Sequence, residues 1–202
     1  MNPAAGPEPK PHRALRAVED AEALDGPAAE ITRVLRGPAE STVGRLLRGR
    51  WLGHPLHPIA VTIPIGAWLC SAAFDLIPGR QDTARRLVAA GLLATPLAIV
   101  LGWADYADLD ARQRRVGLVH AAGNATATAL FGASYLARTR GHVVRGRLLG
   151  ALGLAAASAA GALGGHLAYA QGAGVFRWQE PLDDVDPGEA AGENPAAPRN
   201  PA

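Results

Sequence analysis

Four long apolar stretches without Lys, Arg or Glu most constrain how this chain folds. They cover residues 58–77, 87–104, 116–137 and 148–170. Each is close to the roughly 20 residues that an α-helix needs to cross the hydrocarbon core of a bilayer. Helices on the surface of a soluble bundle carry charge on their outer face in every turn, and these stretches do not. The sequence therefore predicts an all-α fold, a four-helix transmembrane bundle with short amphipathic N-terminal helices and disordered tails.

Arginines cluster in the connections between the apolar stretches, as is typical of loops at a membrane surface. Nearly equal numbers flank the two surfaces, so the positive-inside rule does not set the orientation. We expect a multi-pass protein of the plasma membrane with the lipid bilayer as its main partner. A net charge of +2 gives no strong field for nucleic acid, which we exclude as a partner. A homo-oligomer is one assembly that the sequence leaves open.

The chain divides into three parts, the apolar region and one segment on each side of it. Residues 1–50 begin with a polar, Pro-rich stretch that we expect to be disordered, and amphipathic patterns follow it. These patterns predict either interfacial helices on the membrane or a short helical hairpin docked on the bundle. Residues 51–178 form the transmembrane domain. Residues 179–202 are acidic and rich in Pro and Ala, which predicts a disordered tail.

Two kinds of residue predict how the helices pack. Pro64 and Pro96 lie inside the first and second apolar stretches, where each removes a backbone hydrogen bond and should kink its helix. Gly161 and Gly165 lie four residues apart in the fourth stretch, and small residues at that spacing let helices approach closely in lipid.

Most of the histidines are predicted to lie near the membrane surface that holds both termini. His54 and His57 lie in a Pro-rich segment that should be extended and not helical, and Pro58 after it suits the first turn of the first predicted helix. His120 lies about four residues into the third stretch and His166 about four residues before the end of the fourth, so the alternation of the helices brings both to the same surface. Asp105, at the end of the second stretch, belongs to that surface as well.

Polar residues inside a membrane usually face the interior of the bundle and mark a site, and imidazoles on facing helices are how bundles hold cofactors. The candidate cofactor-binding residues are His54, His57, His120, His166 and Asn124. The candidate metal ligands are His57, His120, His166 and Asp105, and no catalytic residue is predicted. In the alternative interpretation, the histidines only cap helix ends and make hydrogen bonds between helices.

Five short motifs follow one another along the chain: Leu-Gly-His-Pro-Leu-His-Pro (52–58), Ile-Pro-Ile-Gly-Ala-Trp (63–68), Arg-Val-Gly-Leu-Val-His (115–120) with Asn124, Leu-Gly-Gly-His-Leu-Ala-Tyr (163–169) and Gly-Ala-Gly-Val (172–175). In this order they resemble the motifs of a bacterial membrane family, domain-of-unknown-function family 2231. The resemblance covers about residues 45–178, and residues 12–50 resemble the lead-in helices of one branch of that family. In that branch a Rieske-type [2Fe–2S] domain follows the membrane module. No cysteine or histidine follows position 166 here, so we expect this chain not to bind that cluster itself.

Three functions remain open from the sequence. The first is a redox module that transfers electrons and binds haem b, a quinone or a transition metal, as the Rieske-linked resemblance implies. A separate Rieske or ferredoxin-like protein would then be its partner. The second is a cofactor-free membrane scaffold or assembly partner. The third is a metal-dependent membrane enzyme or carrier that uses the His and Asp residues.

Overall fold

The computed structural model describes residues 10–175, and all regular structure in that range is helical. The elements are α1 (Lys10–Glu19), η1 (Glu22–Leu24), α2 (Asp25–Glu40), α3 (Thr42–Leu47), α4 (His57–Ala60), α5 (Thr62–Asp75), α6 (Gln81–Tyr106), α7 (Ala111–Thr139), α8 (Val143–Gly165) and η2 (His166–Ala170). The element η2 is a π-helical turn that continues α8. The acidic tail predicted for residues 179–202 and most of the disordered stretch predicted at the N-terminus lie outside the described residues.

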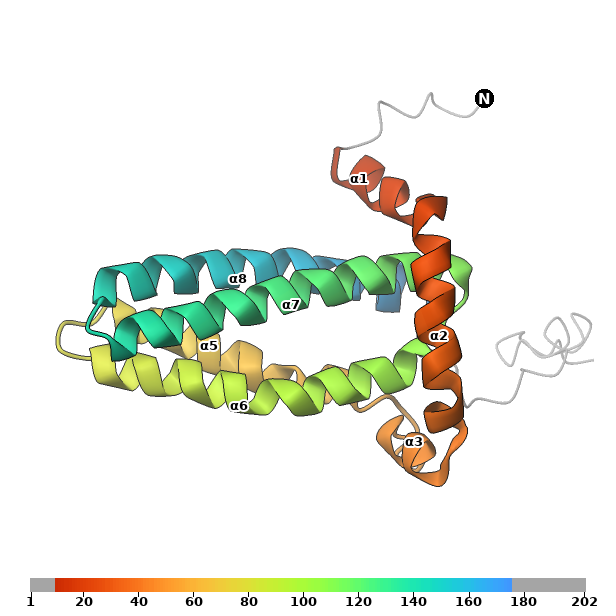
Figure 1. Cartoon of the computed structure of the whole chain (residues 1–202), viewed down its shortest axis with the longest axis horizontal. Helices are drawn as coiled ribbons and strands as arrows, with labels where there is room; N and C mark the ends of the chain where they lie inside the picture. Colours follow the sequence, from red (N-terminus) through yellow and green to blue (C-terminus); the bar gives the residue numbers. More distant parts are fainter. Residues whose placement is uncertain (1–9, 176–202) are drawn as a thin grey trace, which may run out of the picture.

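Helices α5 to α8 lie side by side along the long axis of the molecule, and α1 to α3 cross one end of this bundle (Figure 1). The helices α5 and α6 form one antiparallel hairpin, and α7 and α8 form a second. Both hairpins start at the end that the N-terminal helices cross. The all-helical architecture is therefore as the sequence predicts.

Three helical segments are long and apolar enough to cross a membrane: His57–Asp75, Gln81–Tyr106 and Val143–Ala170. Helix α7 has no Lys, Arg or Glu over 116–137, but polar residues such as His120 and Asn124 lower its mean hydropathy. Of the four predicted spans, three therefore have the length and hydropathy of a membrane-crossing helix, and α7 is not among these three.

The first apolar stretch is divided into α4 and α5, with Val61 between them. Pro64 has no N–H to donate to the carbonyl of Ala60, and its ring would clash with that carbonyl. Helix α4 ends at Ala60 for this reason, so the disruption expected from Pro64 is confirmed. Helix α6 continues without a break through Pro96.

Glycines allow the two helices of each hairpin to pack closely, but they are not the glycines expected from the sequence. An added Cβ at Gly161 or Gly165 would meet nothing within 4 Å, so these two do not mediate helix contacts. A Cβ at Gly91 would lie 2.2 Å from Trp68 Nε1, and one at Gly153 would lie 3.0 Å from the ring of Phe131. The rotation of α8 against its neighbours decides which of its glycines face another helix. The spacing of small residues alone therefore does not identify them.

The N-terminal helices, here called the arm (residues 10–47), are held on the bundle by ion pairs. The Arg115 guanidinium donates two hydrogen bonds of 2.6 Å to the Asp25 carboxylate, and Arg48 donates bonds of 2.6 and 2.7 Å to Asp108. Ser41 caps α3 by accepting a 3.0 Å bond from the backbone N–H of Gly44, as its position predicts. The arm is therefore docked on the bundle, and Val34, Val43 and Leu46 remain exposed on it.

Candidate two-histidine site

His57 begins α4 and is anchored to the second helix of its own hairpin. Its Nδ1–H donates to the carbonyl of Ala98 in α6 at 2.9 Å. The ring lies over Gly102, where an added Cβ would come within 3.0 Å of the imidazole. The missing side chain at Gly102 thus provides the space for the ring, and the carbonyl one turn earlier in α6 fixes its orientation.

His120 is anchored in the same way within the second hairpin. Its Nδ1–H donates to the carbonyl of Ala160 in α8 at 2.7 Å, and a Cβ at Gly164 would lie 2.8 Å from the ring. The side-chain amide of Asn124, one turn further along α7, lies 3.2 Å from Nε2 of His120 and 3.0 Å from its backbone carbonyl. Asn124 therefore reaches the nitrogen that Ala160 does not bind.

The two imidazoles face each other between the hairpins, with ring centroids 6.3 Å apart and planes at 85°. A carbonyl oxygen only accepts, so both rings must carry their proton on Nδ1 in these hydrogen bonds. Each neutral ring then has its lone pair on Nε2, the nitrogen available to a metal ion or to a hydrogen-bond donor. Both rings are half-buried.

The other predicted site residues lie at the same end but do not join this pair. His54 is exposed, and among the described residues its ring lies within hydrogen-bonding distance only of the Pro55 carbonyl, at 3.4 Å. His166 lies in η2, where its Nε2 is 2.5 Å from the carboxylate of Glu19 in the arm. Asp105 is half-buried near the C-terminal end of α6. Among residues 10–175, no three His, Cys, Asp or Glu side chains are grouped as a metal site would require.

The Glu19–His166 pair connects the arm to η2, directly after α8, and no sequence pattern predicts it. Gln171 also donates to Glu19, at 2.9 Å, and Arg112 of α7 lies 4.0 Å from the same carboxylate. The hydrogen bond from His166 is the main reason that the pKa of Glu19 lies below its usual value, with smaller contributions from Gln171 and from the positive charges nearby. This ionised carboxylate fixes the arm across the end that holds the two-histidine site.

Residues that meet between the hairpins occupy equivalent positions in them. His57 and His120, Trp68 and Phe131, and Asp75 and Arg138 are each 63 positions apart. The Trp68 and Phe131 rings stack with centroids 4.0 Å apart, and Asp75 and Arg138 form an ion pair at 2.5 Å. The histidine pair is therefore one of three contacts along a line where the two hairpins face each other.

The second helices of the hairpins repeat one sequence pattern at a spacing of 62 positions. Arg-x-Leu-x-Ala-x-Gly-Leu-x-Ala begins at Arg85 in α6 and again at Arg147 in α8, and Ala-x-x-Leu-Gly follows in both, at 98–102 and 160–164. Ser71 and Ser134, also 63 apart, donate to the carbonyls of Ala84 and Gly146 at 2.9 and 2.6 Å. The bundle thus consists of two copies of one hairpin that run in the same direction, an arrangement known from parallel repeats in membrane proteins.

The family comparison agrees with this membrane architecture. The family described as predicted membrane protein (DUF2231) matches residues 53–177. The chain belongs to this family. The DUF2231 match includes both hairpins and both histidines of the pair, whereas the arm lies outside it. No curated protein and no solved structure matches the chain.

Proposed function

We propose that this DUF2231 protein crosses the plasma membrane four times, with α7 as the additional span. If α6 and α8 both cross, the end of α6 and the start of α8 are on opposite surfaces, and α7 is the segment that connects them. Its 29 residues reach about 44 Å at 1.5 Å per residue, which exceeds the thickness of the hydrocarbon core. Its polar residues His120 and Asn124 are half-buried, which agrees with a polar stripe that faces other helices and not lipid.

We further propose that His57 and His120 coordinate a redox metal centre, either a haem iron or a single transition-metal ion, and that the protein passes electrons through it. The geometry of the pair supports this function. Metal–nitrogen bonds of about 2.0–2.1 Å place the centres of two imidazoles on one ion roughly 6 Å apart, and the observed separation is 6.3 Å. Metal-bound histidines also typically donate their second N–H to a carbonyl, as both rings do here.

Asn124 fits this function as a residue that orients His120. Its amide nitrogen lies between Nε2 and the backbone carbonyl of His120, so it keeps the carbonyl as a partner when a metal takes the lone pair of Nε2. Electron transfer would need a second protein, and a separate Rieske or ferredoxin-like partner suits this role. The acidic and basic side chains of the arm would then lie nearest to it, because the arm crosses the end of the bundle where the pair lies.

A cofactor-free scaffold is the second candidate, and one observation favours it. Each histidine already connects two helices through a backbone carbonyl, α4 to α6 and α7 to α8. Such bonds stabilise helix pairs in lipid without any ligand. A metal-dependent enzyme or carrier, the third possibility from the sequence, has no comparable support among the contacts of residues 10–175.

The deciding experiment is an absorption spectrum and metal analysis of the full-length protein purified in mild detergent, without and with added haem b. A Soret band that is shifted from that of free haem and stays with the protein after free haem is removed indicates bound haem. Stoichiometric metal without a Soret band indicates a bound ion, and a quinone-dependent rise in the unfolding temperature without either indicates a quinone. The first two results support the proposal, whereas the third contradicts metal coordination. Protein that binds none of the three contradicts the redox function and supports the scaffold.

Histidine variants connect the result to the pair. We expect His57→Ala and His120→Ala to lose the metal or haem while the protein remains a monodisperse helical species in detergent. His54→Ala and His142→Ala are matched controls, because both side chains are exposed and lie outside the pair. Equal metal content in all four variants would rule out coordination by His57 and His120.

A further inference from the structure

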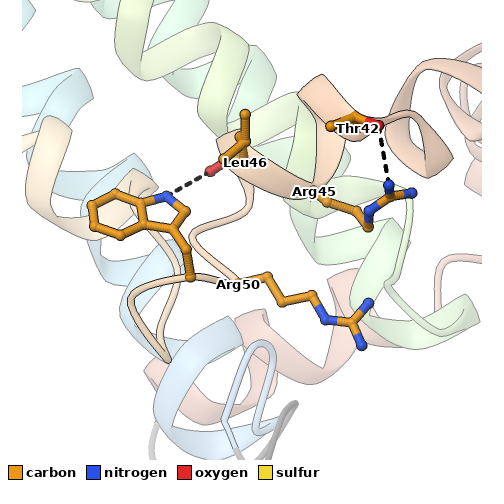
Figure 2. Close-up of a pocket in the computed structure, with 5 residues that line it drawn as sticks. Thr42, Arg45, Leu46 and Arg50 are labelled. Carbon is orange, nitrogen blue, oxygen red and sulfur yellow. Dashed lines mark hydrogen bonds between the residues drawn. The ribbon is translucent and has the colours of Figure 1, made fainter.

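The segment that leads into the first span forms an open hollow beside α3. It has a volume of about 310 Å³ and is lined by Thr42, Arg45, Leu46, Arg50 and Trp51. Arg45 and Leu46 belong to α3, and Arg50 lies in the turn that follows it. The side chains of Arg45 and Arg50 extend in the same direction from their backbones (Figure 2).

Among residues 10–175, no acidic side chain forms an ion pair with Arg45 or Arg50. From Ser41 to His57 the chain has three arginines and no Asp or Glu. Arg48 is bound to Asp108, but Arg45 donates only to neutral oxygens, the Glu40 carbonyl at 2.8 Å and the Thr42 hydroxyl at 3.1 Å. Within the described part of the chain, the Arg50 guanidinium makes no hydrogen bond or ion pair. An anion would therefore find one oriented guanidinium and one unengaged guanidinium at this hollow.

The same segment exposes large apolar side chains, whose contact with water is unfavourable. Val43, Leu46 and Trp51 are 63%, 53% and 66% exposed, although they are large and apolar. The Trp51 indole N–H donates to the carbonyl of Leu46 at 3.3 Å, which fixes the ring beside α3. Tryptophan is enriched where protein meets the lipid headgroups, and an amphipathic helix at that depth buries its apolar face in the lipid.

The position of the segment sets its depth relative to the membrane. The candidate span His57–Asp75 starts only six residues after Trp51, so the hollow lies next to the membrane boundary. Apolar side chains on that boundary and unbalanced arginines beside them match the two parts of a phospholipid, its acyl chains and its phosphate. Arginine suits phosphate because its planar fork donates two parallel hydrogen bonds.

We propose that this hollow binds the phosphate of an anionic phospholipid headgroup, with Arg45 and Arg50 as the phosphate ligands and Leu46 and Trp51 against the acyl chains. Arg45 is held in position by Thr42, and Arg50 closes on the phosphate when the lipid binds. A zwitterionic headgroup fits less well, because its own cation lies beside the phosphate and is repelled by the two guanidinium groups. The proposal depends on the membrane location of the chain and not on any ligand of His57 and His120.

The test measures binding of short-chain phosphatidylglycerol and phosphatidylcholine to the full-length protein in uncharged detergent, by native mass spectrometry with concentration titration. We expect phosphatidylglycerol to bind at least fivefold more tightly. Each surface arginine contributes about 1 kcal/mol to binding of anionic lipid, or roughly fivefold in affinity, so Arg45→Gln/Arg50→Gln should weaken phosphatidylglycerol binding about 25-fold. Arg33→Gln/Arg36→Gln removes two exposed charges from α2 and is the matched control, with unchanged affinity expected.

Three results would overturn the proposal. Equal binding of the two lipids contradicts selection of an anionic headgroup. Equal loss of binding in the α2 control contradicts a defined site at the hollow, because general charge attraction then accounts for the affinity. Full displacement of phosphatidylglycerol by millimolar inorganic phosphate identifies a free anion, and not a lipid, as the occupant. An unchanged unfolding temperature of both double variants in the absence of lipid verifies that the protein remains folded.

Discussion

Removal of the Asp75 carboxylate is the sharpest test of the interface between the two hairpins. The pair with Arg138 is largely withdrawn from solvent, with side chains 12% and 3% exposed, and its shortest N–O distance is 2.5 Å. Removing one partner of a buried ion pair costs about 3–5 kcal/mol, because the other charge remains buried without compensation. We expect Asp75→Asn to lower the free energy of unfolding by that amount. Arg138→Gln should cost less, because Asp75 retains Arg147 at 3.4 Å.

A charge exchange tests whether the two positions are truly equivalent. In Asp75→Arg/Arg138→Asp, the new arginine would have Ser71 one turn earlier, as Arg138 now has Ser134, whose hydroxyl lies 3.2 Å from its Nε. Arg138 also packs over Gly146, where a Cβ would lie 2.5 Å from its Cγ, but the equivalent residue facing position 75 is Ala84. The exchange alone should therefore remain destabilised, also because the new arginine would lie near Arg147, which is 3.4 Å from Asp75 in the native protein. Adding Ala84→Gly should recover part of the loss.

Equilibrium unfolding in mixed detergent micelles, followed by tryptophan fluorescence, measures these differences. Asp82→Asn is the control, because it removes an exposed carboxylate near the same end of the bundle, where surface pairs contribute about 1 kcal/mol or less. The reasoning is refuted if Ala84→Gly does not improve the charge exchange, or if Asp75→Asn behaves like the control. The first result would mean that the 63-residue spacing does not reflect equivalent environments, and the second that burial does not strengthen the pair of Asp75 and Arg138.

Two further predictions address the helix contacts and the arm. Gly91→Ala should lower the free energy of unfolding by about 1–3 kcal/mol, because the added Cβ would lie 2.2 Å from Trp68 Nε1. Gly161→Ala, whose Cβ would meet nothing within 4 Å, should leave the free energy of unfolding unchanged or raise it by up to about 1 kcal/mol. Both are measured in the same unfolding assay. The hydrogen bond from His166 lowers the pKa of Glu19, so its stabilising effect should be complete at neutral pH and be lost as the pH falls through that lowered pKa. The unfolding temperature of Glu19→Gln should accordingly be below that of the wild type at pH 7 and equal to it at the lowest pH. Glu22→Gln, at an exposed position, is the control and should equal the wild type at every pH. A difference between Glu19→Gln and the wild type that persists on acidification would exclude ionisation of Glu19 as the cause.

The sequence was sufficient for the helical architecture and for part of the site, but not for its partners. Long apolar stretches without Lys, Arg or Glu predict helices directly, and the alternation of four helices predicts that His57 and His120 lie at one end of the bundle. His166 shared the same depth but is bound by Glu19, 147 positions earlier in the chain. Depth follows from position along a helix, whereas the partner of a side chain depends on helix rotation and on segments distant in sequence. The glycine contacts were missed for this reason.

The internal repeat could have been found in the sequence, because Arg-x-Leu-x-Ala-x-Gly-Leu-x-Ala occurs twice without change. It lies in α6 and α8, the helices that supply the glycine notches and carbonyls. The first helices, α5 and α7, share little beyond His57 with His120 and Ser71 with Ser134. The histidines are therefore evident from their own positions, whereas their equivalence follows from the repeated residues of α6 and α8.

The way in which the paired positions differ follows from what two copies of one hairpin can tolerate where they face each other. Two aspartates or two arginines at positions 75 and 138 would repel in a medium of low dielectric constant, so an opposite pair is required there. Two indoles would overfill the space that Trp68 and Phe131 occupy with ring centroids 4.0 Å apart. Two neutral imidazoles are subject to neither restriction, because each donates its N–H to its own hairpin and neither is charged. The histidines are therefore the one pair of the three that can remain identical, and a ligand between them would be bound by the same nitrogen from both hairpins.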